Sequence, residues 1–531
     1  MNSGHHHKNP LNPRSYLSSI ILSLTLLTAL LLAPMGAIHA ADPDSGPAVL
    51  TCDLAVIGGG SGGFGAALAA ARMGADVVLV EKADCLGGNS VRGGVNIWEP
   101  GVGGTGIPFE LYQRLRKLTN AVGVYSFGRH LSWFNPQRES FRYPGGETVI
   151  DPARRYPDTL QRHIPPGEQS TEAYRREHQH GVVFEPDAMA STMLAMLEET
   201  AHCRVLLNTA FVSAESEAGR IQRLKLSDGR ILIADYFVDA TGDANLCVAA
   251  GCETMTGQEA RDRFGEPSAP TNATKRVNGV SLLYRVAPRP APGIEPLAEG
   301  IPTNCWWAKS FPVAQVNHYP NGDLNVNMLP TMDGAEFLQR GYAGALEECR
   351  RRVLAHWHDW QTRFPEFRAY RLSWTAPALG IRESHRIVGE YVLTEHDVRG
   401  GLSGQRHADI ICLVDHPPDT HGSHAGGIGE LREPYGVPYR CLIPPGQLNL
   451  LIACRAASFS SIAASSCRLS RTMMQLGQAA GTAAALAKEL EVDLPEVPPQ
   501  HLRDALRKQH VQLEHPMPEE LCRLLTKEDG F

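Results

Sequence analysis

The chain has 531 residues, of which 43% are hydrophobic and 20% charged, and its formal net charge at neutral pH is -7. This length and composition predict more than one domain, or one elaborated domain, and exclude a mostly disordered protein. The sequence has no dense run of Lys and Arg, so it lacks the basic footprint of a nucleic-acid-binding protein, and we expect no nucleic-acid partner.

The first 40 residues differ in character from the rest of the chain. Lys8 and Arg14 give a weakly basic start, an apolar run follows at 17–33, and a small residue, Ala40, ends the segment. This order is typical of a secretory signal peptide and predicts a periplasmic or secreted mature protein. The apolar run of about 17 residues is also at the lower limit of a membrane span, so an uncleaved membrane anchor is the alternative.

A strand, a glycine-rich turn, a helix and a second strand follow one another between Cys52 and Lys82. The apolar strands are residues 53–57 and 76–80, and between them lie the turn GGGSGG at 58–63 and an Ala-rich helical segment at 64–73. Together they form a complete Rossmann βαβ unit, in which the pyrophosphate of a dinucleotide lies against the helix N-terminus.

The residue types of this unit match the needs of a dinucleotide. Gly58 permits the tight turn, Gly60 lets the backbone approach the pyrophosphate, and Gly63 lets the helix pack closely on the strand. Glu81 lies 21 residues after Gly60, where a carboxylate accepts hydrogen bonds from ribose hydroxyls. An acid at this place argues against NADP, so FAD or NAD is expected.

Distant segments favour FAD over NAD. A glycine pair, Gly87-Gly88, follows the second strand; a later strand at 231–238 ends in DATGD; and a strand at 448–453 precedes a small-residue helix at 472–488. An FAD site of the glutathione-reductase type recruits segments so far apart, and an NAD site rarely does. The expected cofactor contacts are Gly58, Gly60, Ser61, Gly63, Glu81, Lys82, Gly87, Gly88, Asn89, Thr241, Gly242, Asp243, Arg455 and Gly477.

The chain resembles the FAD-dependent oxidoreductase family (FAD_oxidored), which is related to the glutathione-reductase and fumarate-reductase flavoproteins. Besides the motifs above, the matching blocks are GGVNIWEPGVGG at 93–104, VDATGD at 238–243, LGIRESHRIVGEYVLTEHD at 379–397, DTH at 419–421, VPYRCLIP at 437–444, and 449–485. One departure is Ala453-Cys454-Arg455, where the family usually has Ala-Gly-Arg near the flavin.

The same resemblance implies that FAD is held non-covalently. Fumarate reductases with covalent FAD carry a His shortly after the glycine pair, and this chain has Asn89, Ser90 and Val91 there.

These elements predict an α/β fold with a discontinuous, glutathione-reductase-like Rossmann domain for FAD and an inserted α+β substrate or cap domain. The FAD-binding domain comprises 50–110, 181–256 and 436–490, the cap comprises 111–180 and 257–435, and 491–531 form a helical C-terminal tail. Asp228-Gly229 predicts a hairpin turn, and helices are expected at 187–200 and 347–364.

Two arginines outside the dinucleotide unit are candidates for substrate binding. Arg382 and Arg386 are four residues apart, so a helical turn would place both guanidinium groups on one face, where they can clamp a carboxylate. A surface charge cluster is the alternative. Arg455, Arg468 and Arg471 precede the last helix and are further candidates for facing the flavin or a substrate acid, with plain surface arginines as the alternative.

A histidine in a Gly-rich loop is the candidate proton-transfer group. His421 follows Asp419, and histidine titrates near neutral pH. We place His421 and Arg382 on opposite sides of one pocket. Solvent-exposed loop histidines are one alternative, and a metal site formed by His416, His421 and His424 is another, but we expect no metal.

The sequence thus predicts an exported FAD-dependent oxidoreductase that transfers a hydride between the flavin and a small organic substrate, including a carboxylate-bearing one. The alternatives are a redox-inert FAD-binding protein and an electron-transfer subunit. The latter requires a separate redox partner, because the chain has no C-x-x-C-H motif or cysteine cluster. Among its 12 cysteines, Cys247 and Cys252 lie five residues apart; export permits disulfides, but the spacing fixes no pairing.

Overall fold

The computed structural model describes residues 48–126, 131–132, 148–162, 164–165, 168–169, 171–307, 313–328, 330–421, 426–427 and 429–529. The chain divides into two units, 1–48 and 49–531, and the fold below is that of the second unit. In these described ranges no helix is long and apolar enough to cross a membrane. The predicted signal peptide lies outside them.

The largest sheet has seven strands, and its centre is parallel. In spatial order the parallel strands are β8 (Cys203–Leu206), β2 (Val77–Val80), β1 (Val49–Ile57), β11 (Ile231–Asp239) and β22 (Leu450–Ile452). β10 (Arg220–Leu226) pairs antiparallel with β11, and β9 (Phe211–Glu217) pairs antiparallel with β10. In this register Ile57 lies opposite both Val80 and Asp239, so three strand ends meet at one edge. Parallel sheets of this kind place ligands at the carboxyl ends of their strands.

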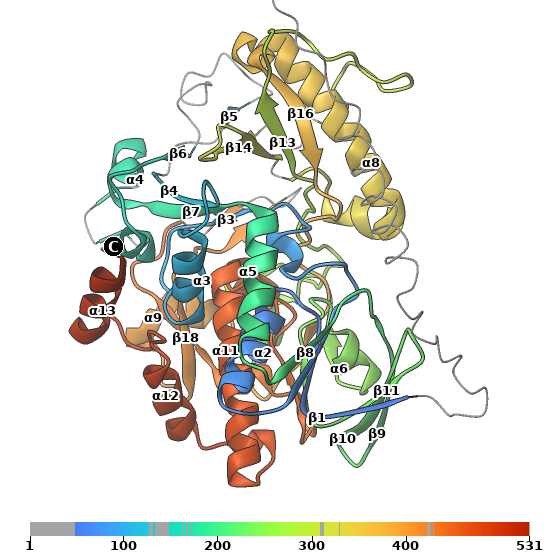
Figure 1. Cartoon of the computed structure of the whole chain (residues 1–531), viewed down its shortest axis with the longest axis vertical. Helices are drawn as coiled ribbons and strands as arrows, with labels where there is room; N and C mark the ends of the chain where they lie inside the picture. Colours follow the sequence, from blue (N-terminus) through green and yellow to red (C-terminus); the bar gives the residue numbers. More distant parts are fainter. Residues whose placement is uncertain are drawn as a thin grey trace, which may run out of the picture. The chain divides into compact units, whose positions relative to one another are not determined.

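Three helices lie side by side on this sheet: α2 (Ser61–Arg72), α5 (Pro186–Glu198) and α11 (Ser470–Leu490), as Figure 1 shows. α2 and α11 pack through small residues. A Cβ atom on Gly477 would collide with the carbonyl oxygen of Gly62, and one on Gly481 with that of Ala66. Gly477 therefore permits close helix packing, whereas the sequence had predicted a cofactor contact at this position.

The predicted elements of this region are present with small differences in their limits. The expected helix at 187–200 is α5, and the expected hairpin joins β10 to β11 through Gly229, whose φ of 88° favours glycine. The helix expected at 347–364 is present, but it begins 13 residues earlier, at Gly334. α8 (Gly334–Arg363) merges two helical segments across Gly341, which has a φ of 67°.

α8 lies along an antiparallel five-stranded sheet (Figure 1), and these elements share a second hydrophobic core. The strand order is β16 (Tyr370–Thr375), β13 (Tyr284–Pro288), β15 (Leu324–Met328), β14 (Val313–His318) and β5 (Leu131–Ser132). Its fully buried residues run from Val280 to Leu379, within the segment predicted as the cap. Most buried hydrophobic residues between Ile387 and Ile443 belong instead to the larger core around the seven-stranded sheet, which we call the first core. This differs from the predicted cap limit at residue 435.

Smaller sheets connect these layers. One has four strands in the order β3 (Ile97–Trp98), β7 (His180–Phe184), β4 (Val122–Ser126) and β6 (Val149–Ile150). The others are two-stranded and pair β18 (Ile410–Val414) with β21 (Tyr435–Pro438), β12 (Thr254–Met255) with β17 (Arg386–Ile387), and β19 (Asp419–Thr420) with β20 (Gly426–Gly427). The other helices are α3 (Ile107–Leu115), α4 (Glu172–His178), α6 (Asn245–Ala249), α7 (Arg261–Phe264), α9 (Glu395–Gly404), α10 (Ser461–Ser466), α12 (Pro499–Lys508) and α13 (Glu519–Asp529). The C-terminal segment is helical, as predicted, and it buries Leu502 and Leu506 in the first core.

Candidate active site

A cavity of about 320 Å³ lies where β1, β2 and β11 end. Most of the predicted cofactor contacts line it: Gly58, Gly60, Ser61, Glu81, Lys82, Gly88, Asn89, Thr241, Gly242, Asp243 and Arg455. Gly63, Gly87 and Gly477 do not line it. Gly87 shapes the adjacent turn, because its φ is 104° and its N–H donates to the carbonyl of Gly59. We call this space the cofactor cavity.

The glycine turn leaves the cofactor cavity open. Gly58 has a φ of 105°, and a Cβ there would collide with the carbonyl of Ala240. A Cβ on Gly63 would collide with the carbonyl of Gly58, so this glycine allows the helix–strand packing that the sequence predicted. Around Gly60, by contrast, a Cβ would meet no heavy atom within 4 Å. The backbone next to the N-terminus of α2 is thus accessible to an anion such as a pyrophosphate.

Glu81 is buried at the end of β2, and its carboxylate is held in place by two backbone donors. Its Oε2 accepts a hydrogen bond from the N–H of Gly59 at 2.6 Å, and its Oε1 accepts one from Ala83 at 2.7 Å. Each carboxylate oxygen can accept a second bond, so both can still receive ribose hydroxyls. The open glycine turn, the helix N-terminus and this fixed acid together fit the adenosine diphosphate part of FAD.

A second cavity of about 460 Å³ adjoins the first. We call it the substrate cavity. The two cavities share the lining residues Asn89, Ile381, Arg455, Arg468 and Ser470. Ser470 is the first residue of α11, so a helix N-terminus lies at the junction, two residues before the position predicted. Such a terminus stabilises negative charge.

Arg382 enters the substrate cavity and has no counter-ion among the described residues. Its Nη1 donates to the carbonyl of Gly279 at 2.9 Å and contacts the Oγ of Ser281 at 3.1 Å. In the part of the chain that the structure describes, no carboxylate lies within ion-pair distance of this guanidinium. Burial, together with the charge of Arg468, lowers the pKa of Arg382 to about 9. A bound anion would relieve this destabilisation of the cation.

His421 lines the same cavity as Arg382. Its Nε2 lies 2.7 Å from Oδ2 of Asp419, a carboxylate that also pairs with Arg468 at 3.3 Å. Burial and the charge of Arg382 lower the pKa of His421 to about 4, although Asp419 opposes the shift. The expectation that His421 titrates near neutral pH was therefore wrong, because its site is desolvated and cationic. A neutral His421 donates Nε2–H to Asp419 and leaves Nδ1 as an acceptor.

Arg386 does not lie beside Arg382. Residues 381–385 form no helical turn, and Arg386 begins strand β17, which points its side chain away from the cavity lining. The guanidinium is fully buried and pairs with Glu259 at 2.7 Å and Glu383 at 3.0 Å. The predicted two-arginine clamp is corrected to a single arginine, and Arg386 belongs to the scaffold beneath it.

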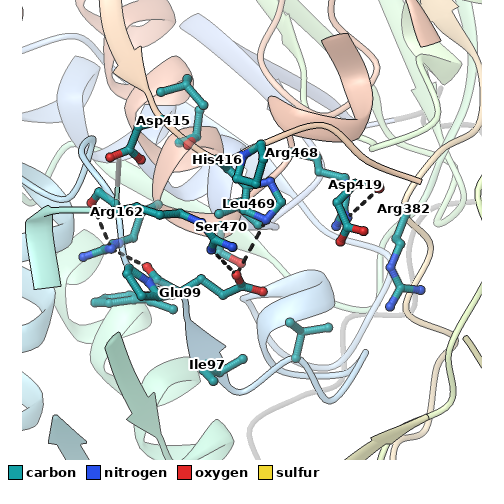
Figure 2. A pocket seen from close by; sticks show the side chains of 18 of the residues that line it. Ile97, Glu99, Arg162, Arg382, Asp415, His416, Asp419, Arg468, Leu469 and Ser470 are labelled. Carbon is teal, nitrogen blue, oxygen red and sulfur yellow. Dashed lines mark hydrogen bonds and ion pairs between the residues drawn. The ribbon is translucent and has the colours of Figure 1, made fainter. Parts of the chain in front are cut away.

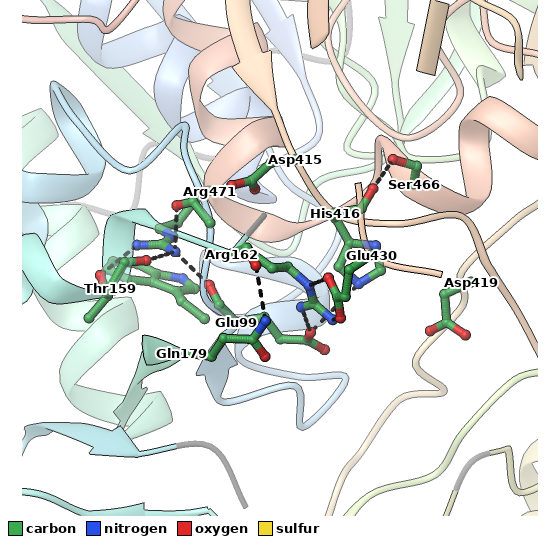
Figure 3. A network of polar contacts seen from close by, with 12 residues as sticks. Glu99, Thr159, Arg162, Gln179, Asp415, His416, Asp419, Glu430, Ser466 and Arg471 are labelled. Carbon is green, nitrogen blue, oxygen red and sulfur yellow. Dashed lines mark hydrogen bonds and ion pairs between the residues drawn. The ribbon is translucent and has the colours of Figure 1, made fainter. Parts of the chain in front are cut away.

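The far end of the substrate cavity contains acidic residues that the sequence did not single out. Figure 2 shows Arg382 at one end and Glu99 with Arg162 at the other. Arg162 bridges Glu99 at 2.5 Å and Glu430 at 3.1 Å, and Nε2 of His416 lies 3.6 Å from Glu99 (Figure 3). Burial raises the pKa of Glu99, but Arg162 and His416 outweigh it and hold this pKa well below its usual range.

Asp415 is a buried carboxyl group in the same region. Its two oxygens share one donor, the N–H of Val102, each at 3.1 Å. Burial raises the pKa of Asp415 to about 7, against smaller opposing effects of that hydrogen bond and of Arg162. The sequence signals for this end of the cavity were the segment at 93–104, His416 and Arg471.

The metal alternative gains no support from the residues that the structure describes, in which no group of three or more His, Cys, Asp or Glu side chains could hold a metal ion. His424 lies outside the described residues.

Comparisons with known proteins identify the family of the chain. The sequence profile of the family described as FAD dependent oxidoreductase (FAD_oxidored) matches residues 53–506, which confirms the predicted family. None of the curated proteins compared with the chain matches it.

Three solved structures illustrate the structural similarity. A geranylgeranyl bacteriochlorophyll reductase-like protein from Thermoplasma acidophilum is 12% identical over 91% of this chain and 97% of that chain, with a TM-score of 0.42. An L-amino acid deaminase from Proteus myxofaciens is 12% identical over 86% and 94%, with a TM-score of 0.38. A glycine oxidase from Geobacillus kaustophilus is 13% identical over 80% and 92%, with a TM-score of 0.37. These values are too low to transfer a substrate or a reaction.

Proposed function

The chain belongs to the FAD dependent oxidoreductase family, so FAD is its cofactor, and we propose that it oxidises or reduces a small carboxylate-bearing substrate in the substrate cavity. Bound FAD supplies the redox chemistry by accepting or giving a hydride. The observation that carries the proposal is that Arg382, which has no counter-ion among the described residues, and the Asp419–His421 pair line one cavity next to the cofactor cavity.

The cofactor cavity supplies the groups that hold FAD. The backbone at Gly60 and the N-terminus of α2 receive the pyrophosphate, and Glu81 accepts the ribose hydroxyls. Asn89 lies in both cavities and donates from Nδ2 to the carbonyl of Ile381 at 2.8 Å. It begins the stretch Asn89, Ser90 and Val91, in which covalent flavoproteins of the related group carry a His, and this supports non-covalent binding. Acid precipitation should release the yellow colour into the supernatant, and colour in the pellet would contradict this.

Arg382 and His421 have different roles: the first binds the substrate and the second transfers a proton. Arg382 binds the carboxylate, since a desolvated guanidinium forms strong bidentate hydrogen bonds with such a group. Asp419 fixes the imidazole of His421 so that Nδ1 can accept the substrate proton that leaves with the hydride, or return it in the reverse direction. Because the pKa of His421 is lowered to about 4, the imidazole is neutral at neutral pH and Nδ1 is free of a proton.

The test is anaerobic bleaching of the purified holoprotein with a panel of small hydroxy-, amino- and saturated carboxylates, each of which can give a hydride to the flavin. With a compound that bleaches the wild type, Arg382→Ala should raise the concentration required roughly 10- to 100-fold, the value of a hydrogen bond to a charged group. His421→Ala should slow reduction by ~10²–10⁴-fold. Both variants should retain FAD, and the wild-type rate should not fall between pH 8 and pH 5.

The exposed Arg432 offers a matched control, because Arg432→Ala removes an arginine that lines neither cavity. Wild-type rates in both site variants would place the chemistry elsewhere. If no compound and no chemical reductant bleaches the flavin, the redox-inert alternative holds.

Export is part of the same proposal and rests on the N-terminal pattern. Mass analysis of the protein from the cell envelope should find a chain that begins near Ala41. A chain that keeps residues 1–40 in the membrane fraction would support the anchor instead.

A further inference from the structure

The end of α6 has a backbone geometry that brings two side chains together. Gly251 has a φ of 80°, its N–H donates to the carbonyl of Val248 at 3.0 Å, and the N–H of Cys252 donates to the carbonyl of Cys247 at 2.9 Å. This pair of bonds is the Schellman motif, which ends a helix through a left-handed glycine. The motif brings the residue after the glycine against the residue in the last helical turn, and here both residues are cysteines.

The two thiols differ in their surroundings. Cys247 is fully buried, and burial raises its pKa well above the usual value. Cys252 is half-buried, and the hydrogen bond from Cys247 lowers its pKa. Cys252 is therefore the sulfur that a small disulfide can reach, and Cys247 is the sulfur next to it.

We propose that Cys247 and Cys252 are a redox site that forms an intramolecular disulfide across the end of α6. The oxidant is a small-molecule disulfide. The thiolate of Cys252 attacks one of its sulfurs and releases one small thiolate. The thiolate of Cys247 then attacks the sulfur of Cys252 and releases the second. In sum, two protein thiols lose two electrons and two protons, and the small disulfide becomes two thiols.

This site lies directly behind a wall of the cofactor cavity. The N–H of Cys247 donates to Oδ2 of Asp239 at 2.9 Å, and Oδ1 of Asp239 accepts the N–H and the hydroxyl of Thr241 at 2.9 and 2.8 Å. Thr241 lines the cofactor cavity. The disulfide would thus close the far end of a helix whose near end supports a cofactor-binding loop. The inference does not depend on the proposed substrate, because the thiol geometry is independent of the substrate cavity.

The experiment uses the purified full-chain holoprotein, incubated with reduced or oxidised glutathione, quenched in acid and alkylated with N-ethylmaleimide under denaturing conditions. Trypsin releases residues 231–261 as one peptide, which contains Cys247 and Cys252 and no other cysteine. After oxidation this peptide should carry no maleimide and be two hydrogen masses lighter than the dithiol form. After reduction it should carry two maleimides.

Two controls separate this outcome from others. The exposed Cys522 should take up maleimide in the reduced sample, which verifies the alkylation. In Cys252→Ser the peptide should remain labelled at Cys247 after oxidation. The proposal is overturned if the oxidised wild-type peptide carries two maleimides or stops at a glutathione adduct on Cys252. It is also overturned if Cys247 is linked to Cys454, which reaches the same region.

Discussion

The cofactor cavity and the substrate cavity adjoin, but the chain builds them in different ways. Much of the cofactor cavity comes from one continuous stretch, 57–93, in which each residue's place follows from a local strand–turn–helix geometry. The substrate cavity draws its polar residues from separate stretches around Glu99, Arg162, Arg382, His421 and Glu430. A short motif fixes the first cavity, whereas the packing of several sheets fixes the second. Variants in each cavity test whether this difference is real.

The largest expected effect concerns the scaffold of the substrate cavity. Arg386→Ala leaves the buried carboxylates of Glu259 and Glu383 without their cation, which should cost ~3–5 kcal/mol of unfolding free energy. The damage should reach the cavity, because Glu383 accepts the N–H of Asn278 at 2.8 Å, and Oδ1 of Asn278 accepts the N–H of His421 at 2.8 Å. Urea denaturation followed by fluorescence measures the loss.

The exposed Arg432→Ala is again the matched control, and it should leave the denaturation midpoint nearly unchanged. If Arg386→Ala is as stable as the wild type but binds the substrate more weakly, the hypothesis that Arg382 and Arg386 together bind the substrate carboxylate would stand again.

A substitution at a single glycine of the turn beside the cofactor cavity should weaken both the fold and the binding of FAD. Gly63→Ala places a Cβ against the carbonyl oxygen of Gly58, so α2 must move away from β1, which should cost ~1–3 kcal/mol and loosen FAD. The measurement is the flavin retained after dialysis together with the melting temperature. Gly404→Ala, in α9, is the matched control, because its Cβ meets no heavy atom within 4 Å. Normal flavin retention in Gly63→Ala would show that the turn tolerates a side chain.

The sequence predicted these two cavities to different depths. Gly58, Gly60 and Glu81 could be assigned because their tasks follow from their order along one βαβ unit. Arg382 and His421 could be named from their chemistry, but the environment that lowers the pKa of His421 depends on residues far away in the chain. The same limit explains the errors. The four-residue spacing of Arg382 and Arg386 indicated a helix, but Arg386 pairs into a strand with Met255.

The acidic cluster at the end of the substrate cavity could not be assembled from local sequence patterns, although Glu99 lies in the block at 93–104. Arg162 lies 63 positions from Glu99 and 268 from Glu430, and none of the three belongs to a recognisable motif of ligands. Their association depends on how the sheet containing β3 and β7 packs against the loop after β18. Tertiary packing of this kind has no periodicity that a sequence can reveal.

The last expected effect depends on how many hydrogen-bond donors each cavity supplies to its buried carboxyl group. In the cofactor cavity Glu81 receives two separate backbone donors, whereas the oxygens of Asp415 share the N–H of Val102. The pKa of Asp415 is raised to about 7 from 3.8, so the folded state keeps a proton that the unfolded state releases. This contribution to stability is complete below pH 3.8 and is lost as the pH rises towards 7.

Asp415→Asn isolates that contribution, because the amide resembles the protonated acid and does not titrate. Relative to the wild type, the variant should gain about 1.4 kcal/mol of unfolding free energy for each pH unit between 5 and 7, and the gain should level off above 7. The opposing titration of His421 is present in both proteins and cancels in the difference. Urea midpoints at pH 5, 6, 7 and 8 provide the measurement. Parallel curves would mean that Asp415 is already ionised at pH 5. The acidic end would then carry a further negative charge. This charge would repel a substrate carboxylate from that end and favour its binding at Arg382.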